Sequence, residues 1–324
     1  MLKNVKTSFL ALISLIIIGT SVANAEGIRT SVFVWYPSGQ VQRASPNGEG
    51  MFYQACIHPH GGSVIFSGNV SGGPRIWERN LFSQDIKALT PENTASLHGV
   101  YSWDGDSIAF TSDINTGKKL PTFVVESLSG QGQPPAGSVM NIHVMDSDGR
   151  NIRQLTFGNY TDQRPTFSPD GKTITFVRLI RHLEKMIPTL WSVSTDGSGQ
   201  AAPIVLSGTG WAYRPWYSRD GRTIYFFTID EKSRHRIASV SVEGGDIEFL
   251  AADNEGRSHG PFVDSNGETL LMHSTRGKGD QHKIWEIPLS GGPPIQLMPP
   301  GFDPTANVMH ATRSKNGILA FDTY

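Results

Sequence analysis

Several side chains that could bind a metal ion, hold an anion or transfer a proton recur at one place in a repeated pattern of the chain. They are Gln54, His98, Arg164, Arg214 and His310, with His259 one residue before the corresponding position in the fifth repeat, Gly260. Imidazole nitrogens bind transition metals and exchange protons near neutral pH, and guanidinium groups hold carboxylates or phosphates through paired hydrogen bonds. If the repeats close into a ring, these side chains are predicted to converge on one channel.

The elements that must position these side chains are six short segments of similar pattern. Each has an apolar run, a polar turn that ends in glycine, and a second apolar run. The segments are CIHPHGGSVIF from Cys56, VYSWDGDSIAF from Val100, TFSPDGKTITF from Thr166, WYSRDGRTIYF from Trp216, FVDSNGETLLM from Phe262 and TRSKNGILAF from Thr312. Asp-Gly and Asn-Gly pairs supply the positive φ that tight hairpins require. Each segment is therefore predicted to form a β-hairpin.

The spacing of the hairpins indicates the architecture. Their turn glycines are Gly61, Gly105, Gly171, Gly221, Gly267 and Gly317, at successive intervals of 44, 66, 50, 46 and 50 residues. A period near 50 residues is typical of a β-propeller with four strands per blade. A β-sandwich is the alternative, but it gives no reason for a hairpin to recur at this period.

The two ends of the chain complete this argument. The sixth hairpin finishes at the last residue, so its blade lacks an outer strand pair, whereas residues 28–44 form an outer-type pair ahead of the first hairpin. Joining the two halves would remove two exposed sheet edges. We therefore predict an all-β fold, a six-bladed β-propeller closed by N- and C-terminal strands that share the last blade.

Charge and the first residues bear on location and partners. Lys plus Arg number 28 against 29 Asp plus Glu, a balance that provides no strong field for nucleic acid. Residues 1–25 contain two lysines, an apolar run from Phe9 to Ile18 and a small-residue ending at Ala25, which is typical of a signal peptide. The apolar run is shorter than the roughly 20 residues of a membrane span. We expect a signal peptide over 1–25, a propeller domain over 26–324, and a periplasmic or secreted protein that does not span a membrane.

Two insertions fall in loops predicted to border the channel mouth. Residues 113–139 are rich in Gly, Pro and Ser, which favours a surface flap, and RLIRHLEKMIPT from Arg178 is expected to include one helical turn.

One channel arginine could also have a purely structural role. Asp162 lies two residues before Arg164 and could hold it in an ion pair.

Three stretches resemble a known family of repeats. RPTFSPDGKTITFVR from Arg164, RPWYSRDGRTIYFFT from Arg214 and NIHVMDSDGRNIRQLT from Asn141 are similar to the PD-type propeller repeats of the TolB family. The resemblance extends over nearly all of the chain after residue 25. It implies an exported propeller that binds a protein or peptide partner, or a small anionic ligand, and that acts in envelope transport or integrity. TolB proteins carry an α/β domain ahead of the propeller, which this chain is expected to lack.

An enzymatic alternative rests on the same channel residues. Oligogalacturonate lyases are also propellers with related repeats, and they use a His and Gln metal site with a nearby Arg to abstract a proton. The channel set of Gln54, three histidines and two arginines has the residue types for that chemistry. The alternative is thus a lyase or hydrolase with a divalent metal, for which His98, His259 and His310 are the candidate ligands. No nucleophile with an adjacent base is recognisable in the sequence, so no catalytic residue is assigned and a binding module is favoured.

Overall fold

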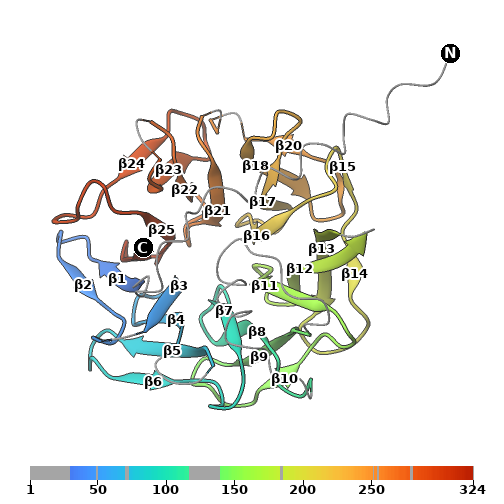
Figure 1. Ribbon diagram of the computed structural model, residues 1–324, viewed down its shortest axis with the longest axis horizontal. Coiled ribbons are helices and arrows are strands. Elements are labelled where there is room, and N and C mark those ends of the chain that lie inside the picture. The colour runs from blue at the N-terminus through green and yellow to red at the C-terminus, as the bar shows by residue number, and fades with distance from the viewer. Residues whose placement is uncertain are drawn as a thin grey trace.

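A computed structural model describes residues 30–48, 50–69, 73–116, 139–182, 185–250, 252–253, 255–277 and 280–323. The described residues form strands and turns and contain no helix, so none of them belongs to a helix that could cross a membrane. Six four-stranded antiparallel sheets lie as blades around a central axis (Figure 1). The predicted six-bladed β-propeller is confirmed. The signal peptide predicted over 1–25 and most of the insertion predicted over 113–139 lie outside the described residues.

The first three blades take their strands in chain order, from the innermost strand outward. Blade one contains β3 (Met51–Ile57), β4 (Ser63–Asn69), β5 (Arg75–Asn80) and β6 (Ile86–Ala88). Blade two contains β7 (Ser96–Tyr101), β8 (Ser107–Ser112), β9 (Asn141–Asp146) and β10 (Arg153–Gln154). Blade three contains β11 (Thr161–Phe167), β12 (Thr173–His182), β13 (Lys185–Ser194) and β14 (Ala202–Pro203).

The last three blades complete the ring. Blade four contains β16 (Tyr213–Tyr217), β17 (Thr223–Ile229), β18 (His235–Ser241) and β20 (Glu248–Phe249). Blade five contains β21 (Ser258–Val263), β22 (Thr269–Ser274), β23 (Lys283–Pro288) and β24 (Ile295–Leu297). Blade six contains β25 (Val308–Arg313), β26 (Leu319–Thr323), β1 (Ser31–Trp35) and β2 (Val41–Arg43). A short parallel pair, β15 (Leu206–Ser207) with β19 (Gly245–Asp246), joins blades three and four.

Closure of the ring takes place in blade six, as predicted. Strand β1 pairs antiparallel with β26, with Phe33 opposite Phe321 and Val34 opposite Ala320. In Figure 1 the blue beginning and the red end of the described chain lie side by side in this blade. Val34 and Phe321 are fully buried, so the closing strands contribute to the core as well as to the hydrogen-bonded sheet.

The two inner strands of every blade follow one local design. The predicted hairpin glycines all have positive φ, from 70° at Gly171 to 89° at Gly105, which a residue without Cβ adopts at no steric cost. In the second strand the same position carries a fully buried phenylalanine in five blades and a methionine in the fifth blade. These residues are Phe66, Phe110, Phe176, Phe226, Met272 and Phe321. Each packs within a core between neighbouring blades, which fixes the blades around the axis.

The expected helical turn after Arg178 is wrong. Strands β12 and β13 instead continue as one long antiparallel pair, from Thr173 opposite Ser194 to His182 opposite Lys185. Leu179 and Leu190 in this pair are buried in the core, so the sequence extends an existing hairpin. An extended ladder pairs backbone groups of both strands with each other, whereas a single isolated helical turn leaves most of its backbone groups unpaired.

Candidate functional site

The innermost strand of each blade is distorted at the position singled out from the sequence. The register of each first strand shifts there, between Tyr53 and Cys56 in blade one and at the corresponding residues of the other five. We call the residues at this point the bulge residues. They are Gln54 (φ 57°), His98 (φ 59°), Arg164 (φ 54°), Arg214 (φ 55°), Gly260 (φ 60°) and His310 (φ 51°). A left-handed backbone is uncommon in non-glycine residues, and here it recurs in every blade.

The bulge frees the backbone N–H of the bulge residue from the strand ladder, and this N–H donates a hydrogen bond to a side chain of the neighbouring blade. Gln54 N donates to Asp322 Oδ2 at 2.9 Å and His98 N donates to Ser67 Oγ at 3.0 Å. In each case the acceptor lies on the second strand of the preceding blade. Arg164 N makes the equivalent bond to Thr111 Oγ1 at 3.2 Å. The strained conformation is therefore held by hydrogen bonds between blades.

All six bulge residues line one central cavity of about 90 Å³. The remaining wall is largely apolar and includes Trp216, Phe262 and the buried thiol of Cys56. Burial raises the pKa of that thiol to about 12, so it stays protonated and unreactive. No aspartate or glutamate lines the cavity among the described residues. Arginine guanidinium groups are thus the charged groups of its wall, and the cavity is suited to an anionic group.

Within the cavity, one arginine is held by its neighbours from the ring. With the side-chain amide of Gln54 oriented to accept, its oxygen receives hydrogen bonds from Arg164 Nη1 at 2.7 Å and Nη2 at 3.0 Å. The guanidinium of Arg164 also lies over the ring of Tyr213, 4.8 Å from its centre. The expected pair between Asp162 and Arg164 is wrong, because Asp162 pairs with Arg178. Asp162 and Arg178 face each other across β11 and β12, whereas Arg164 stands at the bulge itself, two residues further along β11.

Beside the cavity, five of the ten histidines form a contiguous group across blades four, five and six. We call it the histidine cluster, and its members are His235, His259, His273, His282 and His310. Neighbouring ring centres are 4.7 to 5.5 Å apart. Local structure explains the grouping of three of them. His259 and His273 are cross-strand partners on β21 and β22, and His282 directly precedes β23 of the same blade.

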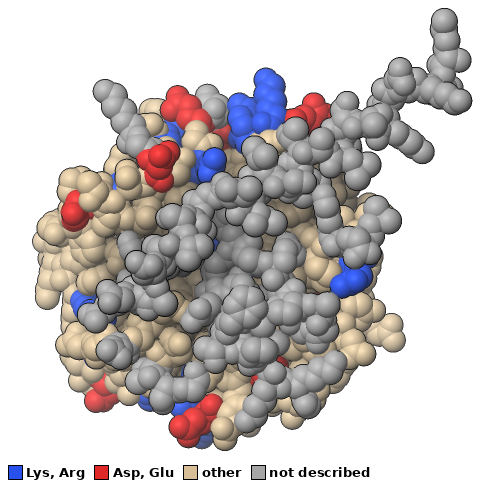
Figure 2. Space-filling model, in the orientation of Figure 1, with Lys and Arg blue, Asp and Glu red and all other residues tan. Residues whose placement is uncertain are grey.

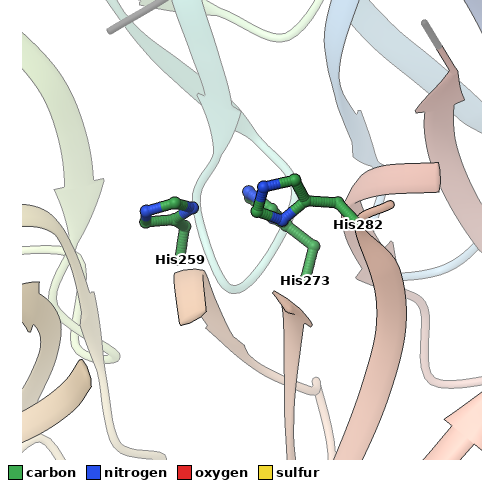
Figure 3. Close-up of side chains that lie close together, drawn as sticks. All are labelled: His259, His273 and His282. Atoms are coloured by element: carbon green, nitrogen blue, oxygen red, sulfur yellow. The ribbon is translucent and has the colours of Figure 1, made fainter. Parts of the chain in front are cut away.

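The centre of the cluster has the composition of a metal site. One ring nitrogen from each of His259, His273 and His282 lies within 4.8 Å of the others, and the three rings point toward one another (Figure 3). His259 Nδ1 and His282 Nδ1 are buried, and neither has a hydrogen-bond partner among the described residues. The other nitrogen of His259 lies 2.5 Å from His235 Nδ1. Buried polar atoms usually find a partner, so two open imidazole nitrogens at one place indicate an incomplete ligand set.

The surroundings keep these imidazoles neutral. Burial lowers the pKa of His259 and His273 well below the ordinary value, and neighbouring histidines and Arg214 lower it further. Burial, followed by the charge of Arg257, lowers the pKa of His282 to about 4. A neutral imidazole is the form that binds a metal ion. At the edge of the cluster, His310 Nδ1 lies 2.9 Å from both carboxylate oxygens of Asp322.

The structure distributes the sequence-predicted residues between these two places. Gln54, His98, Arg164, Arg214 and His310 line the cavity. His259 lies in the histidine cluster, where the described metal-ligating group contains neither His98 nor His310. His98 instead has its Nδ1 3.2 Å from Thr111 Oγ1.

Sequence reasoning missed the other members of the histidine cluster. His273 occupies the second-strand position that carries Ser67, Thr111 and Asp322 in other blades, where the side chain accepts a hydrogen bond from the backbone N–H of the next blade's bulge residue. Extending the alignment of the hairpins to the second strand would have found it. His235 begins a third strand and His282 directly precedes one, and no turn or repeat signal in the sequence places them near the channel.

Comparisons with known proteins support the TolB resemblance. No protein-family model matches the chain. A protein TolB homolog of Chlorobium chlorochromatii is 27% identical over 140 residues, which is 36% of this chain and 31% of that protein. The match thus spans about a third of the relative's length.

Solved structures resemble the whole propeller. A structure assigned as TolB from Agrobacterium tumefaciens has a TM-score of 0.66 at 18% identity and covers 91% of this chain and 98% of its own. An oligogalacturonate lyase from Vibrio parahaemolyticus has a TM-score of 0.54 at 14% identity, over 90% of this chain and 77% of its own. At these identities the structural likenesses establish the fold. The chain is therefore a six-bladed β-propeller that is similar in fold to these TolB and lyase structures.

Proposed function

We propose that this TolB-like propeller is an exported binding module that holds a carboxylate of a protein or peptide partner in its central cavity. The carboxylate would be an acidic side chain or a chain terminus. One observation carries the proposal: all six bulge residues line a single cavity that includes two arginines and no described acidic residue. Guanidinium groups fixed by their surroundings bind carboxylates with little loss of conformational entropy.

The charges on the described surface support a protein partner better than a polyanion. On the described part of the face in Figure 2, lysines and arginines lie among aspartates and glutamates, mostly near the rim. The whole chain has a formal net charge of −1. Such a mixed surface attracts no nucleic acid at long range. Recognition would therefore depend on short-range contacts at the cavity.

A panel of synthetic peptides tests the proposal by isothermal titration calorimetry. Peptides with glutamate or a free C-terminal carboxylate should bind, whereas matched peptides with glutamine and an amidated terminus should bind more weakly. Arg214→Gln should reduce the affinity roughly ten- to a hundredfold, which is the value of one or two charge-assisted hydrogen bonds. The matched control is Arg150→Gln, because Arg150 lies on the surface in an exposed pair with Asp148.

Two results would overturn this function. One is equal affinity for the carboxylate peptides and their neutral counterparts. The other is equal weakening by Arg214→Gln and Arg150→Gln, since general surface charge would then explain the binding. If neither result is obtained, crosslinking in extracts of the exported fraction would identify the natural partner, with Arg214→Gln as the negative control.

A lyase that acts on an acidic sugar is the second candidate, and the histidine cluster favours it. The chemistry would need a cation to stabilise the enolate-like charge that develops when a proton next to a carboxylate is removed. Incubation of the protein with oligogalacturonate and divalent metal should then give an unsaturated product with ultraviolet absorbance. No increase in absorbance, with a metal bound, would exclude this candidate.

Export itself is part of the proposal. Cleavage after Ala25 would leave a chain that begins at Glu26, five residues before β1. N-terminal sequencing of protein recovered from the periplasm or the medium should read Glu-Gly-Ile-Arg. Recovery of the protein only with its first residues intact, and only from the cytoplasm, would contradict it.

A further inference from the structure

We infer that His259, His273 and His282 form a binding site for one divalent transition-metal ion, with His235 as the group that orients His259. This inference goes beyond the proposed binding of a carboxylate and does not depend on it. The three histidines belong to a single blade, on β21, on β22 and directly before β23. Their position is therefore fixed by one sheet and does not depend on how blades move relative to one another.

The geometry is close to that of a three-histidine site. Ligand nitrogens on a tetrahedral zinc ion, with bonds of about 2.0 to 2.1 Å, lie roughly 3.4 Å apart. The three candidate nitrogens lie within 4.8 Å of one another, so rotations of the rings would bring them onto one ion. Three nitrogen ligands leave a fourth position for water or for a donor atom of a bound partner.

The fifth blade is adapted to make room for these rings. In the other five blades the bulge residue has a side chain, whereas blade five has Gly260. A Cβ atom at Gly260 would lie 2.9 Å from Cε1 of His273 and 3.1 Å from its Nδ1. The glycine therefore provides the space in which the His273 ring packs against the cavity wall. The other five blades form the same bulge with residues that have side chains, so the bulge itself does not require glycine in blade five.

The partners of the rings also fit a metal site. A histidine that binds a metal usually gives its second ring nitrogen to another polar group, which fixes the tautomer. His259 Nε2 bonds to His235 Nδ1, and this leaves the buried Nδ1 of His259 without a partner. His282 Nδ1 is likewise buried and has no hydrogen-bond partner in the described part of the chain. A bound cation would satisfy nitrogens that are otherwise buried at a cost in free energy.

The donor set selects the class of metal. Imidazole nitrogens suit Zn²⁺, Cu²⁺, Ni²⁺ and Fe²⁺, whereas Mg²⁺ and Ca²⁺ require oxygen ligands, and this ligand group contains no carboxylate. The positive charge of Arg214 disfavours the binding of a dication nearby. Arg214 lies close to the His273 ring, because a Cβ atom at Gly260 would meet both His273 and Arg214 Nη1, the latter at 3.3 Å. An anionic fourth ligand, such as hydroxide or a carboxylate, would offset that repulsion.

Metal titration of the full exported chain, without a histidine tag, tests the inference. After treatment with a chelator, calorimetry with Zn²⁺ should show one ion per chain, and Mg²⁺ and Ca²⁺ should not compete. His273→Gln and His282→Gln should each weaken Zn²⁺ binding at least a hundredfold, and His235→Gln should weaken it about ten- to a hundredfold. The matched control, His60→Gln, removes an exposed histidine and should leave binding unchanged.

The outcomes separate a specific site from misfolding and from surface binding. Thermal melts without metal show whether each variant folds, and His282→Gln is the most informative because His282 is only partly buried. Loss of binding in a folded His282→Gln, together with a Co²⁺ spectrum typical of tetrahedral nitrogen ligation in the wild type, supports the site. Absence of stoichiometric Zn²⁺ binding in the wild type, or retention of it in both ligand variants, overturns it.

Discussion

The guanidinium of Arg178 donates two hydrogen bonds to the carboxylate of Asp162, at 2.6 and 2.7 Å, and both side chains are buried. Arg178 also lies between the rings of Tyr160 and Trp191, 4.0 and 4.5 Å from their centres. This pair occupies the inner hairpin of blade three. It leaves Arg164 available to the cavity, where Arg164 contacts Gln54 and Tyr213.

Arg178→Gln is expected to lower the free energy of unfolding by about 3 to 5 kcal/mol, because it leaves the buried carboxylate of Asp162 without its partner. Denaturation by guanidinium chloride measures the loss. Arg150→Gln, which breaks the exposed pair with Asp148, should change stability little. Equal losses of unfolding free energy in the two variants would show that the buried pair contributes no more to stability than the exposed pair.

Phe321→Ala should destabilise the closing blade by about 3 to 5 kcal/mol, because it opens a cavity between strands from the two ends of the chain. Phe321 is fully buried and stacks on Phe33, with ring centres 5.8 Å apart. The matched control is Phe82→Ala, since Phe82 is 84% exposed and its loss should cost less than about 0.5 kcal/mol. Similar melting temperatures for the two variants would contradict closure by these strands.

Gly260→Ala should reduce stability by about 1 to 3 kcal/mol, because alanine is strained at a φ of 60° and its Cβ would collide with the His273 ring. Gly39→Ala separates the two causes. Gly39 also has a positive φ, 89°, but a Cβ there would meet no atom within 4 Å. Chemical denaturation of both variants should show the larger loss for Gly260→Ala. A larger loss for Gly39→Ala would mean that His273 does not need the space.

Stability should fall as the pH decreases below about 6.5. The folded state lowers the pKa of His259, His273 and His282, the last to about 4. Between these values the unfolded chain takes up protons that the folded chain does not, so acid favours unfolding, whereas above pH 6.5 the contribution is complete. Thermal melts at pH 7.5 and pH 5 measure the difference.

The variant His282→Gln should show a smaller difference between the two pH values, because one of the three groups no longer titrates. His182→Gln, which changes an exposed histidine outside the cluster, serves as the control and should behave as the wild type. A pH profile unaffected by His282→Gln would mean that His282 binds protons equally in the folded and unfolded states.

Much of the fold was predictable because its signals are local. An Asp-Gly or Asn-Gly turn between two apolar runs encodes a hairpin within about ten residues, and the recurrence of such turns predicts the blades. The bulge residues were found for the same reason, since they stand at a fixed distance before each turn. The helical turn expected after Arg178 was wrong because pairing with β13 overrides the local preference of a short segment.

The sequence by itself determined the number of blades and their closure in blade six, and it predicted which side chains would face the channel. Only the tertiary structure decided which of those side chains act together. His235, His259, His273 and His282 are separated by up to 47 residues, as the numbers 235 and 282 show, and they meet because strands of two adjoining blades place them in register. Contacts between strands and between blades depend on the packing of the whole ring. A local sequence pattern therefore does not predict them.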